Sequence, residues 1–268
     1  MKIVIADPAK NITVFILDPV ESPAERAALA RAILAEKSLA AEQVGFVNPP
    51  GGLWRLEMMG GEFCGNAARS FGLYVAVEQG LKGKGGVSVS VSGAEGPVRV
   101  EVDTEKNLAA AEMPKPIAVE TIDYEDRSLP AVAFEGITHF IATGLEAKRE
   151  TFFVIKSSAE KKLLSLGREL PAAMGVMFYD AASGFMIPLV HVRSTDSLIF
   201  ESSCGSGSAA LGVWLSREMA DGVARYAIAQ PGGVIETEVA KKNGDITGLT
   251  IGGEVKLNEP QDFPHFMV

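Results

Sequence analysis

Thiols and imidazoles are scarce in this chain, which has two cysteines and three histidines among its 268 residues. The histidines, His139, His191 and His265, are scattered, and no pair of them has the close spacing that marks a zinc site. Two cysteines could form one disulfide, but the reducing cytosol disfavours a disulfide that stabilises the fold. We therefore expect neither a metal site nor a structural disulfide.

Long apolar runs and an excess of basic residues are absent as well. No segment approaches the roughly 20 consecutive apolar residues of a membrane-spanning helix. The first residues, MKIVIADPAK, lack the regions of a secretion signal. A formal net charge of −9 provides no basic face for nucleic acid. We expect a cytoplasmic globular protein that binds neither nucleic acid nor a membrane.

The two cysteines stand in similar contexts 140 positions apart. Cys64 begins the run CGNAAR and Cys204 begins CGSGSA, and each run continues into small residues that indicate a helix. Both halves then read as strand, glycine turn and strand, with the period-two alternation of a half-buried sheet. A further strand precedes each cysteine, at 53–59 and at 196–200. This self-similarity predicts an internal duplication.

The duplication predicts an α+β fold of two pseudo-symmetric lobes, each a mixed β-sheet wrapped around a central helix that begins at its cysteine. We place the N-terminal lobe at 1–120 and the C-terminal lobe at 121–268, and leave open whether the C-terminal tail returns to the first lobe. A proline-containing link is expected at about 113–130. Helices at 22–37 and 158–169 occupy similar places in the two halves.

A cysteine at the beginning of a helix meets unpaired backbone N–H groups and the positive end of the helix dipole. Both stabilise a thiolate, so we expect the pKa of each cysteine to lie below the ~8.5 of a free thiol. Gly65 and Gly205 let a ligand approach the backbone, and the same N–H groups can bind a carboxylate.

If pseudo-twofold symmetry brings the two helix starts face to face, one thiolate can remove a Cα proton while the opposite thiol returns one. This reaction inverts a stereocentre without pyridoxal phosphate. Either cysteine alone would more simply be inert packing. A redox couple is also an alternative, although CxxC spacing is absent. The recurrence of the thiol in matching contexts favours acid–base catalysis by the pair.

The motifs at 64–69 and 204–209 resemble those of the diaminopimelate epimerase superfamily. Its members are cofactor-independent racemases that use two cysteines. The resemblance covers essentially the whole chain. It implies the two-lobed epimerase fold with the active site between the lobes. It also implies that Cys64 and Cys204 are the acid–base pair, that no cofactor is used, and that a homodimer is allowed.

The resemblance also implies roles for other residues, which stand at positions that match functional residues of the family. His139 in GITHF matches a histidine beside the thiols, and Glu201 resembles an acidic residue that positions them. Taken alone, His139 would be an ordinary core histidine and Glu201 a solvated or capping charge. The residues that the resemblance and the helix-start argument assign to the substrate are Asn11, Gln43, Gly65, Asn66, Gly205 and Ser206.

The substrate is less clearly indicated than the chemistry. Ile137 stands where diaminopimelate epimerases have an asparagine, and their other distal-group ligands are missing too, which disfavours that substrate. The runs EQVGF, GGEFCGNA and SLIFESSCGSGSA instead resemble the histidine racemase branch, whose members supply D-histidine for staphylopine-type metallophores. Glu42, Glu62 and Glu201 remain equal candidates for an acidic partner of a substrate imidazole.

The sequence leaves other functions as alternatives to a histidine racemase. One is a diaminopimelate epimerase, and another is a proline or hydroxyproline racemase, whose extended pocket signature we do not see. A non-catalytic member of the phenazine-biosynthesis type is disfavoured because members of that branch lack the paired cysteines.

Overall fold

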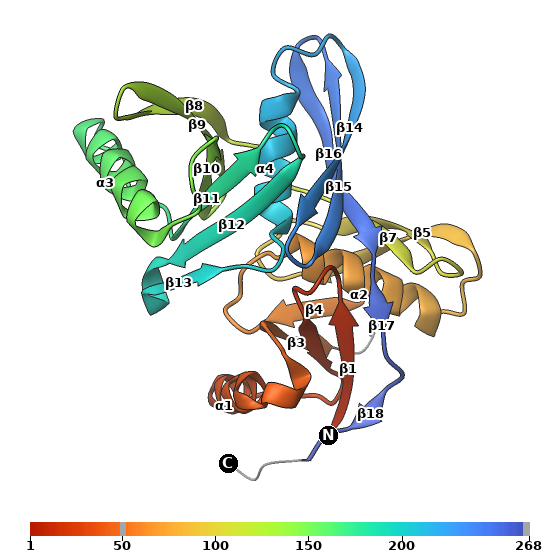
Figure 1. The fold of residues 1–268 in the computed structure, drawn as a ribbon. Helices are drawn as coiled ribbons and strands as arrows, with labels where there is room; N and C mark the ends of the chain where they lie inside the picture. Colours follow the sequence, from red (N-terminus) through yellow and green to blue (C-terminus); the bar gives the residue numbers. More distant parts are fainter. Residues whose placement is uncertain (49–51, 265–268) are drawn as a thin grey trace. The chain divides into compact units, whose positions relative to one another are not determined.

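The chain forms two compact units in the structure, a computed structural model that describes residues 1–48 and 52–264 (Figure 1). Unit 1 comprises Met1–Met113 and Thr250–Val268, and unit 2 comprises Pro114–Leu249. Within the described ranges, no helix is long and apolar enough to cross a membrane.

Unit 1 is built on one mixed sheet with two α-helices and a short 3₁₀ helix. Its strands pair in the order β18-β1-β2-β3-β4-β5-β6-β7-β16, in which β2–β3 and β4–β5 are parallel and the other pairs are antiparallel. The elements of this unit are β1 (Lys2–Asp7), β2 (Thr13–Ile16), α1 (Pro23–Ala35), η1 (Lys37–Leu39), β3 (Gln43–Asn48), β4 (Arg55–Met58), α2 (Gly65–Glu78), β5 (Lys84–Val91), β6 (Val98–Asp103), β7 (Leu108–Glu112), the end of β16 (Asp245–Glu254), β17 (Lys256–Leu257) and β18 (Gln261–Asp262).

Unit 2 repeats this construction with an extra hairpin at its start. Strands β9 and β10 are followed by α3, then β11 and β12, then α4, then β14, β15 and the beginning of β16, and the parallel pairs are β10–β11 and β12–β14. Its elements are β8 (Ala118–Tyr124), β9 (Arg127–Phe134), β10 (Ile137–Thr143), α3 (Arg149–Ser165), β11 (Ala173–Asp180), β12 (Phe185–Val192), η2 (Arg193–Thr195), β13 (Ser197–Phe200), α4 (Gly205–Leu215), β14 (Gly222–Gln230) and β15 (Gly233–Lys242).

The order of elements in unit 1, β-β-α-β-β-α-β-β-β, recurs in unit 2 from β9 onward, with β13 as an insertion. In both units the second α-helix begins immediately after a cysteine, at Gly65 and at Gly205. The predicted α+β fold with cysteine-initiated central helices is therefore confirmed.

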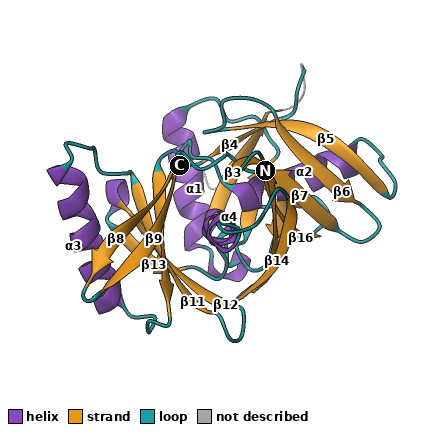
Figure 2. Ribbon diagram, turned by 90° about the horizontal axis from the view of Figure 1, so that it is seen from above, coloured by secondary structure: helices purple, strands orange, loops and turns teal. Residues whose placement is uncertain are grey.

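Each central helix is buried along most of its length because it carries small residues. Figure 2 shows α2 beside β5, β6 and β7, the strands that it contacts. A Cβ on Gly72 would lie 2.5 Å from Val100 Cβ of β6, and a Cβ on Gly212 would lie 2.5 Å from Thr237 Cγ2 of β15. The glycine eight residues after each cysteine thus lets a strand lie directly against the helix, which positions the helix start in its unit.

The prediction of a linker at about 113–130 is wrong. Most of this segment is the antiparallel hairpin of β8 and β9, in which Pro130 stands opposite Thr121. The predicted lobe boundary at residue 120 falls inside β8, whereas the units divide before Pro114 and residues from Thr250 onward belong to unit 1. Proline was interpreted as a loop signal, but backbone pairing across the hairpin accommodates Pro130 within a strand.

The helix expected at 158–169 is found as α3, which spans Arg149–Ser165 and so begins and ends earlier than predicted. It packs on β8 (Figure 2) and buries Phe152, Ile155 and Ala159. Its N-cap residue, Lys148, makes no side-chain capping hydrogen bond, so the sequence carries no start signal there. The helix expected at 22–37 is found as α1, where the Ser22 side chain accepts a hydrogen bond from the backbone N–H of Glu25.

Candidate active site

Both cysteines are N-caps with nearly the same backbone conformation. Cys64 has φ −124° and ψ 114°, and Cys204 has φ −123° and ψ 113°. The Cys64 sulfur accepts from the backbone N–H of Ala67 at 3.4 Å, and the Cys204 sulfur accepts from that of Gly207 at 3.3 Å. Each sulfur thus takes the place of a capping oxygen and meets the N–H groups of a helix start.

A chain of side-chain hydrogen bonds runs from the start of α2 through unit 1. Asn66 Nδ2 donates to Asn11 Oδ1 at 3.1 Å, and Asn11 Nδ2 donates to Glu42 Oε2 at 2.7 Å. At the other end, Arg69 Nε donates to Asn66 Oδ1 at 3.1 Å. Because Arg69 can only donate and the Glu42 carboxylate can only accept, the two ends fix the orientation of both amides. The structure therefore brings Asn11 and Asn66 together beside the Cys64 helix start.

The other expected substrate residues of unit 1 are held at the edges of this network. Thr13 Oγ1 donates to Gln43 Oε1 at 3.4 Å, and Gln43 begins β3 next to Glu42. A Cβ on Gly65 would lie 2.5 Å from Met113 Sδ, so any larger residue directly after Cys64 would have to displace that side chain.

Around Cys204, unit 2 forms a second polar cluster. The backbone N–H of Cys204 donates to Gln230 Oε1 at 2.8 Å, and Gln230 Nε2 donates to Ser208 Oγ at 2.9 Å. Ser206 Oγ lies 3.6 Å from the Cys204 sulfur and 2.9 Å from His139 Nε2. Ser206 therefore bridges Cys204 to His139, two of the predicted catalytic residues.

His139 is fully buried, and burial lowers its pKa to about 3. Its Nδ1 has no hydrogen-bond partner among the residues that the structure describes, and a Cβ on Gly175 would collide with that atom. The imidazole is thus neutral at neutral pH and acts as a hydrogen-bonding group rather than as a cation.

The expectation of a low pKa is wrong for Cys204. Burial raises the pKa of this thiol well above the ordinary value, and the charge and hydrogen bond of the Glu201 carboxylate raise it further. The hydrogen bonds from Ser206 and from the Gly207 N–H act in the opposite direction but do not outweigh these effects. Burial, and after it the carboxylate of Glu201, the predicted positioning residue, thus favour the protonated thiol of Cys204.

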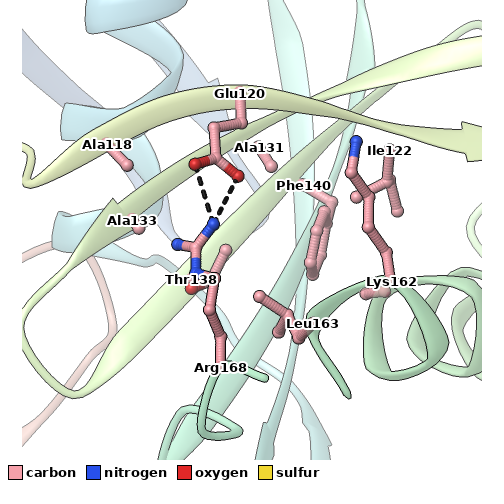
Figure 3. Close-up of a pocket in the computed structure, with 11 residues that line it drawn as sticks. Ala118, Glu120, Ile122, Ala131, Ala133, Thr138, Phe140, Lys162, Leu163 and Arg168 are labelled. Atoms are coloured by element: carbon pink, nitrogen blue, oxygen red, sulfur yellow. Dashed lines mark hydrogen bonds and ion pairs between the residues drawn. The ribbon is translucent and has the colours of Figure 1, made fainter. Parts of the chain in front are cut away.

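A cavity of about 30 Å³ lies elsewhere in unit 2, between α3 and strands β8, β9 and β10 (Figure 3). Alanine and larger apolar side chains line it, and the ion pair of Glu120 and Arg168 lies at its edge. A cavity of this volume has room for ordered water. None of the predicted site residues lines it.

Sequence reasoning missed several residues that hold the two helix starts. Arg69 lies within the first motif, but its backbone partners, the carbonyls of Gly253 and Glu254, are remote in sequence. Gln230 lies outside both cysteine motifs, although it anchors the Cys204 backbone. For Gly175, no motif indicated that a neighbouring strand must make room for His139. His265 lies outside the described residues.

The fold of this chain is an α+β fold that recurs in solved structures of low sequence identity. A crystal structure of a predicted epimerase from Pseudomonas aeruginosa shares this fold with a TM-score of 0.67 at 13% identity, over 99% of this chain and all of that one (100%).

The sequence comparisons are more specific. Residues 1–259 match the family model of the histidine racemase CntK N-terminal domain. The chain is 37% identical over 237 residues to a histidine racemase of Fusobacterium nucleatum subsp. nucleatum, covering 86% of each chain. It is 27% identical over 237 residues to a histidine racemase of Staphylococcus aureus, covering 85% of each. The chain belongs to the histidine racemase family.

Proposed function

We propose that this protein is a cofactor-independent racemase that inverts the Cα of histidine by proton transfer at Cys64 and Cys204. The observation that carries the proposal is the pair of cysteine N-caps with matching backbone geometry, in a member of this family. One thiolate removes the Cα proton, and the other thiol supplies a proton to the resulting carbanion. Backbone N–H groups at a helix start bind the substrate carboxylate and stabilise the charge that develops on it.

The side chains around each thiol have separate tasks in this reaction. Asn11 and Asn66 hold the substrate beside Cys64 in this proposal, which their hydrogen bonds to each other and to Glu42 support. Burial and the Glu201 carboxylate both favour the protonated thiol of Cys204, so this thiol is ready to donate. Ser206 and the neutral His139 orient the Cys204 sulfur through hydrogen bonds.

Glu42 is the acidic residue that fits a substrate imidazole best. Of the three candidates, Glu201 acts on the Cys204 thiol, and Glu62 is exposed. Glu42 is partly buried and joined through Asn11 to Asn66, two residues after Cys64. A carboxylate there can accept an N–H from an imidazole ring, which diaminopimelate and proline lack.

We place the enzyme in the cytoplasm, where a reducing environment keeps both thiols free of disulfides. It uses neither a metal ion nor pyridoxal phosphate.

The direct test is incubation of the purified protein with L-histidine in deuterated water without added cofactor. The proposal expects D-histidine by chiral chromatography and one deuterium at Cα by mass spectrometry. Parallel incubations with diaminopimelate, proline and other L-amino acids test the substrate. Deuterium exchange at Cα of another amino acid but not of histidine would show that histidine is not the substrate. No exchange with any amino acid would overturn the proposed racemase function.

A further inference from the structure

Gln230 is a polar residue at a core-facing position of unit 2. It is the last residue of β14 and lies on the same face of that strand as the buried Ile228, because side chains two apart in a strand share a face. Only 4% of the surface of Gln230 is exposed. A buried amide costs free energy unless its donor and its acceptor are paired, so this position requires polar partners.

The side-chain amide of Gln230 completes a closed ring of hydrogen bonds with Cys204 and Ser208, which are also buried. The Cys204 N–H donates to Gln230 Oε1 at 2.8 Å, and Gln230 Nε2 donates to Ser208 Oγ at 2.9 Å. Ser208 Oγ donates to the Cys204 carbonyl at 2.7 Å, so this hydroxyl accepts from Gln230, and the amide oxygen faces the Cys204 N–H. The ring thus fixes the peptide groups on both sides of Cys204.

The turn after β14 contacts the same segment at a second point, and unit 1 has a similar contact. The backbone N–H of Gly232 donates to the carbonyl of Ser202 at 2.8 Å, and Ser92 Oγ, directly after β5, donates to the carbonyl of Glu62 at 3.0 Å. Each carbonyl lies two residues before the cysteine of its unit. Both units therefore anchor the segment that leads to the cysteine.

The residue of unit 1 that corresponds to Gln230 is Val91. Each is the last residue of the strand that follows the central helix, and each is buried, with Val91 1% exposed. The packing of strand on helix is thus satisfied by an apolar residue at this position, and the fold alone does not call for glutamine. In unit 2 the glutamine adds the hydrogen bonds to Cys204 and Ser208.

We propose that Gln230 is a positioning residue which, together with Ser208, holds the Cys204 sulfur where it exchanges a proton with the substrate Cα. This inference rests on the proposed function, because it assigns a task within that reaction. One torsion, about Cα–Cβ, separates the sulfur from the fixed backbone, so the ring restricts the sulfur to a few staggered positions. Proton transfer depends steeply on such placement. Both residues act through the Cys204 backbone, so their loss lowers kcat and leaves KM nearly unchanged.

The first experiment measures amide hydrogen exchange by NMR in full-length protein whose cysteines carry the NMR-active nitrogen isotope. Two cysteines give two amide signals, which the Cys64→Ser and Cys204→Ser proteins assign. Gln230→Met, similar in length but without the amide, should speed exchange of the Cys204 amide by about tenfold or more, because its acceptor is gone. The Cys64 amide is the internal reference. An unchanged Cys204 exchange rate in folded Gln230→Met protein would overturn the inference.

The second experiment separates positioning from structural support by steady-state kinetics with histidine. Gln230→Met and Ser208→Ala should each lower kcat by about tenfold or more and change KM by less than about twofold. The double variant should lose little more than Gln230→Met alone, because either substitution opens the same ring. Full addition of the two losses would show that the residues act independently and would contradict the ring.

Ser216→Ala is the matched control for Ser208→Ala. Ser216 caps the C-terminus of the same helix, is buried, and also donates to the carbonyl four residues earlier, that of Gly212, at 2.8 Å. Its substitution should lower the unfolding midpoint temperature, as Ser208→Ala does, but leave kcat and Cys204 amide exchange unchanged. An equal loss of kcat in both variants would show that lost stability, not lost positioning, slows the reaction.

These measurements remain decisive in the difficult cases. If Gln230→Met does not fold, Ser208→Ala still tests the ring by amide exchange and by kcat. The amide exchange measurement needs no turnover, so it tests the contact of Gln230 with Cys204 by itself. Failure of the proposed function is recognised separately, by absent Cα exchange in the unmodified protein.

Discussion

Burial sets the protonation of His139 and Cys204 at the residue scale. Both side chains lose the charged form that water would stabilise: the imidazole stays neutral, and the thiol stays protonated. Arg69 keeps its charge despite burial because a guanidinium is so strongly basic. Burial therefore neutralises the imidazole and the thiol but leaves the guanidinium charged.

His139 should make the stability of the protein fall in acid. Its pKa is about 3 in the folded chain and about 6.5 when unfolded, so between these values only the unfolded state binds the proton. The free energy of unfolding should therefore fall as pH decreases below about 6.5, by up to about 1.4 kcal/mol per pH unit from this residue. Urea unfolding from pH 7.5 to 5 measures the slope.

The control for this prediction is another histidine of unit 2. His139→Gln should flatten the acid slope, whereas His191→Gln should leave the contribution of His139 in place. Identical slopes in the unmodified and His139→Gln proteins would show that the buried imidazole does not set the acid response.

Glu42 provides a second prediction at the residue scale. Glu42→Gln should raise KM for histidine by about tenfold or more, because a charge-assisted hydrogen bond to the imidazole becomes a neutral one. Glu62→Gln is the matched control, since Glu62 is exposed. Steady-state kinetics with chiral detection separates KM from kcat. An equal change in KM in both variants would show that Glu42 does not recognise the imidazole.

At the scale of elements, the two central helices depend on close contact with a strand. Gly72→Ala should destabilise the protein by about 1–3 kcal/mol, since the added methyl group overlaps Val100 of β6. Gly96→Ala is the control, because a Cβ there meets nothing within 4 Å. Equal unfolding free energies for the two variants would contradict the packing argument.

The sequence predicted these elements where a local signal exists. Small residues after each cysteine marked both central helices, and alternation marked the strands beside them. The start of α3 has no capping side chain, and Pro130 sits inside a paired strand, so local rules misplaced both. Tertiary pairing decides such segments, and a single sequence does not display it.

The candidate site could be predicted only in part for a related reason. The thiols, Asn66 and Ser206 lie within the motifs, so their grouping with each helix start followed from sequence. The contact of Arg69 with the carbonyl of Gly253 spans 184 positions, and that of Gln230 with Cys204 spans 26. Those contacts depend on how strands return to the helix start.

For the whole molecule, the proposal assigns all of the proton transfer to side chains of the chain itself. Extended dialysis against EDTA, followed by treatment with hydroxylamine to remove any pyridoxal phosphate, should leave racemisation unchanged. Iodoacetamide should abolish it, because alkylated sulfur can neither accept nor donate the proton. Chiral chromatography of the products gives the readout. Activity lost after either removal step and restored by the added cofactor would contradict cofactor independence.

The two-cysteine mechanism is tested most directly by measuring histidine racemisation in Cys64→Ala and Cys204→Ala proteins whose folding is verified by circular dichroism. The account predicts that each single substitution reduces kcat by about a thousandfold or more, because a racemisation cycle needs both a proton acceptor and a proton donor. Turnover at the unmodified rate by either single-cysteine protein would contradict it.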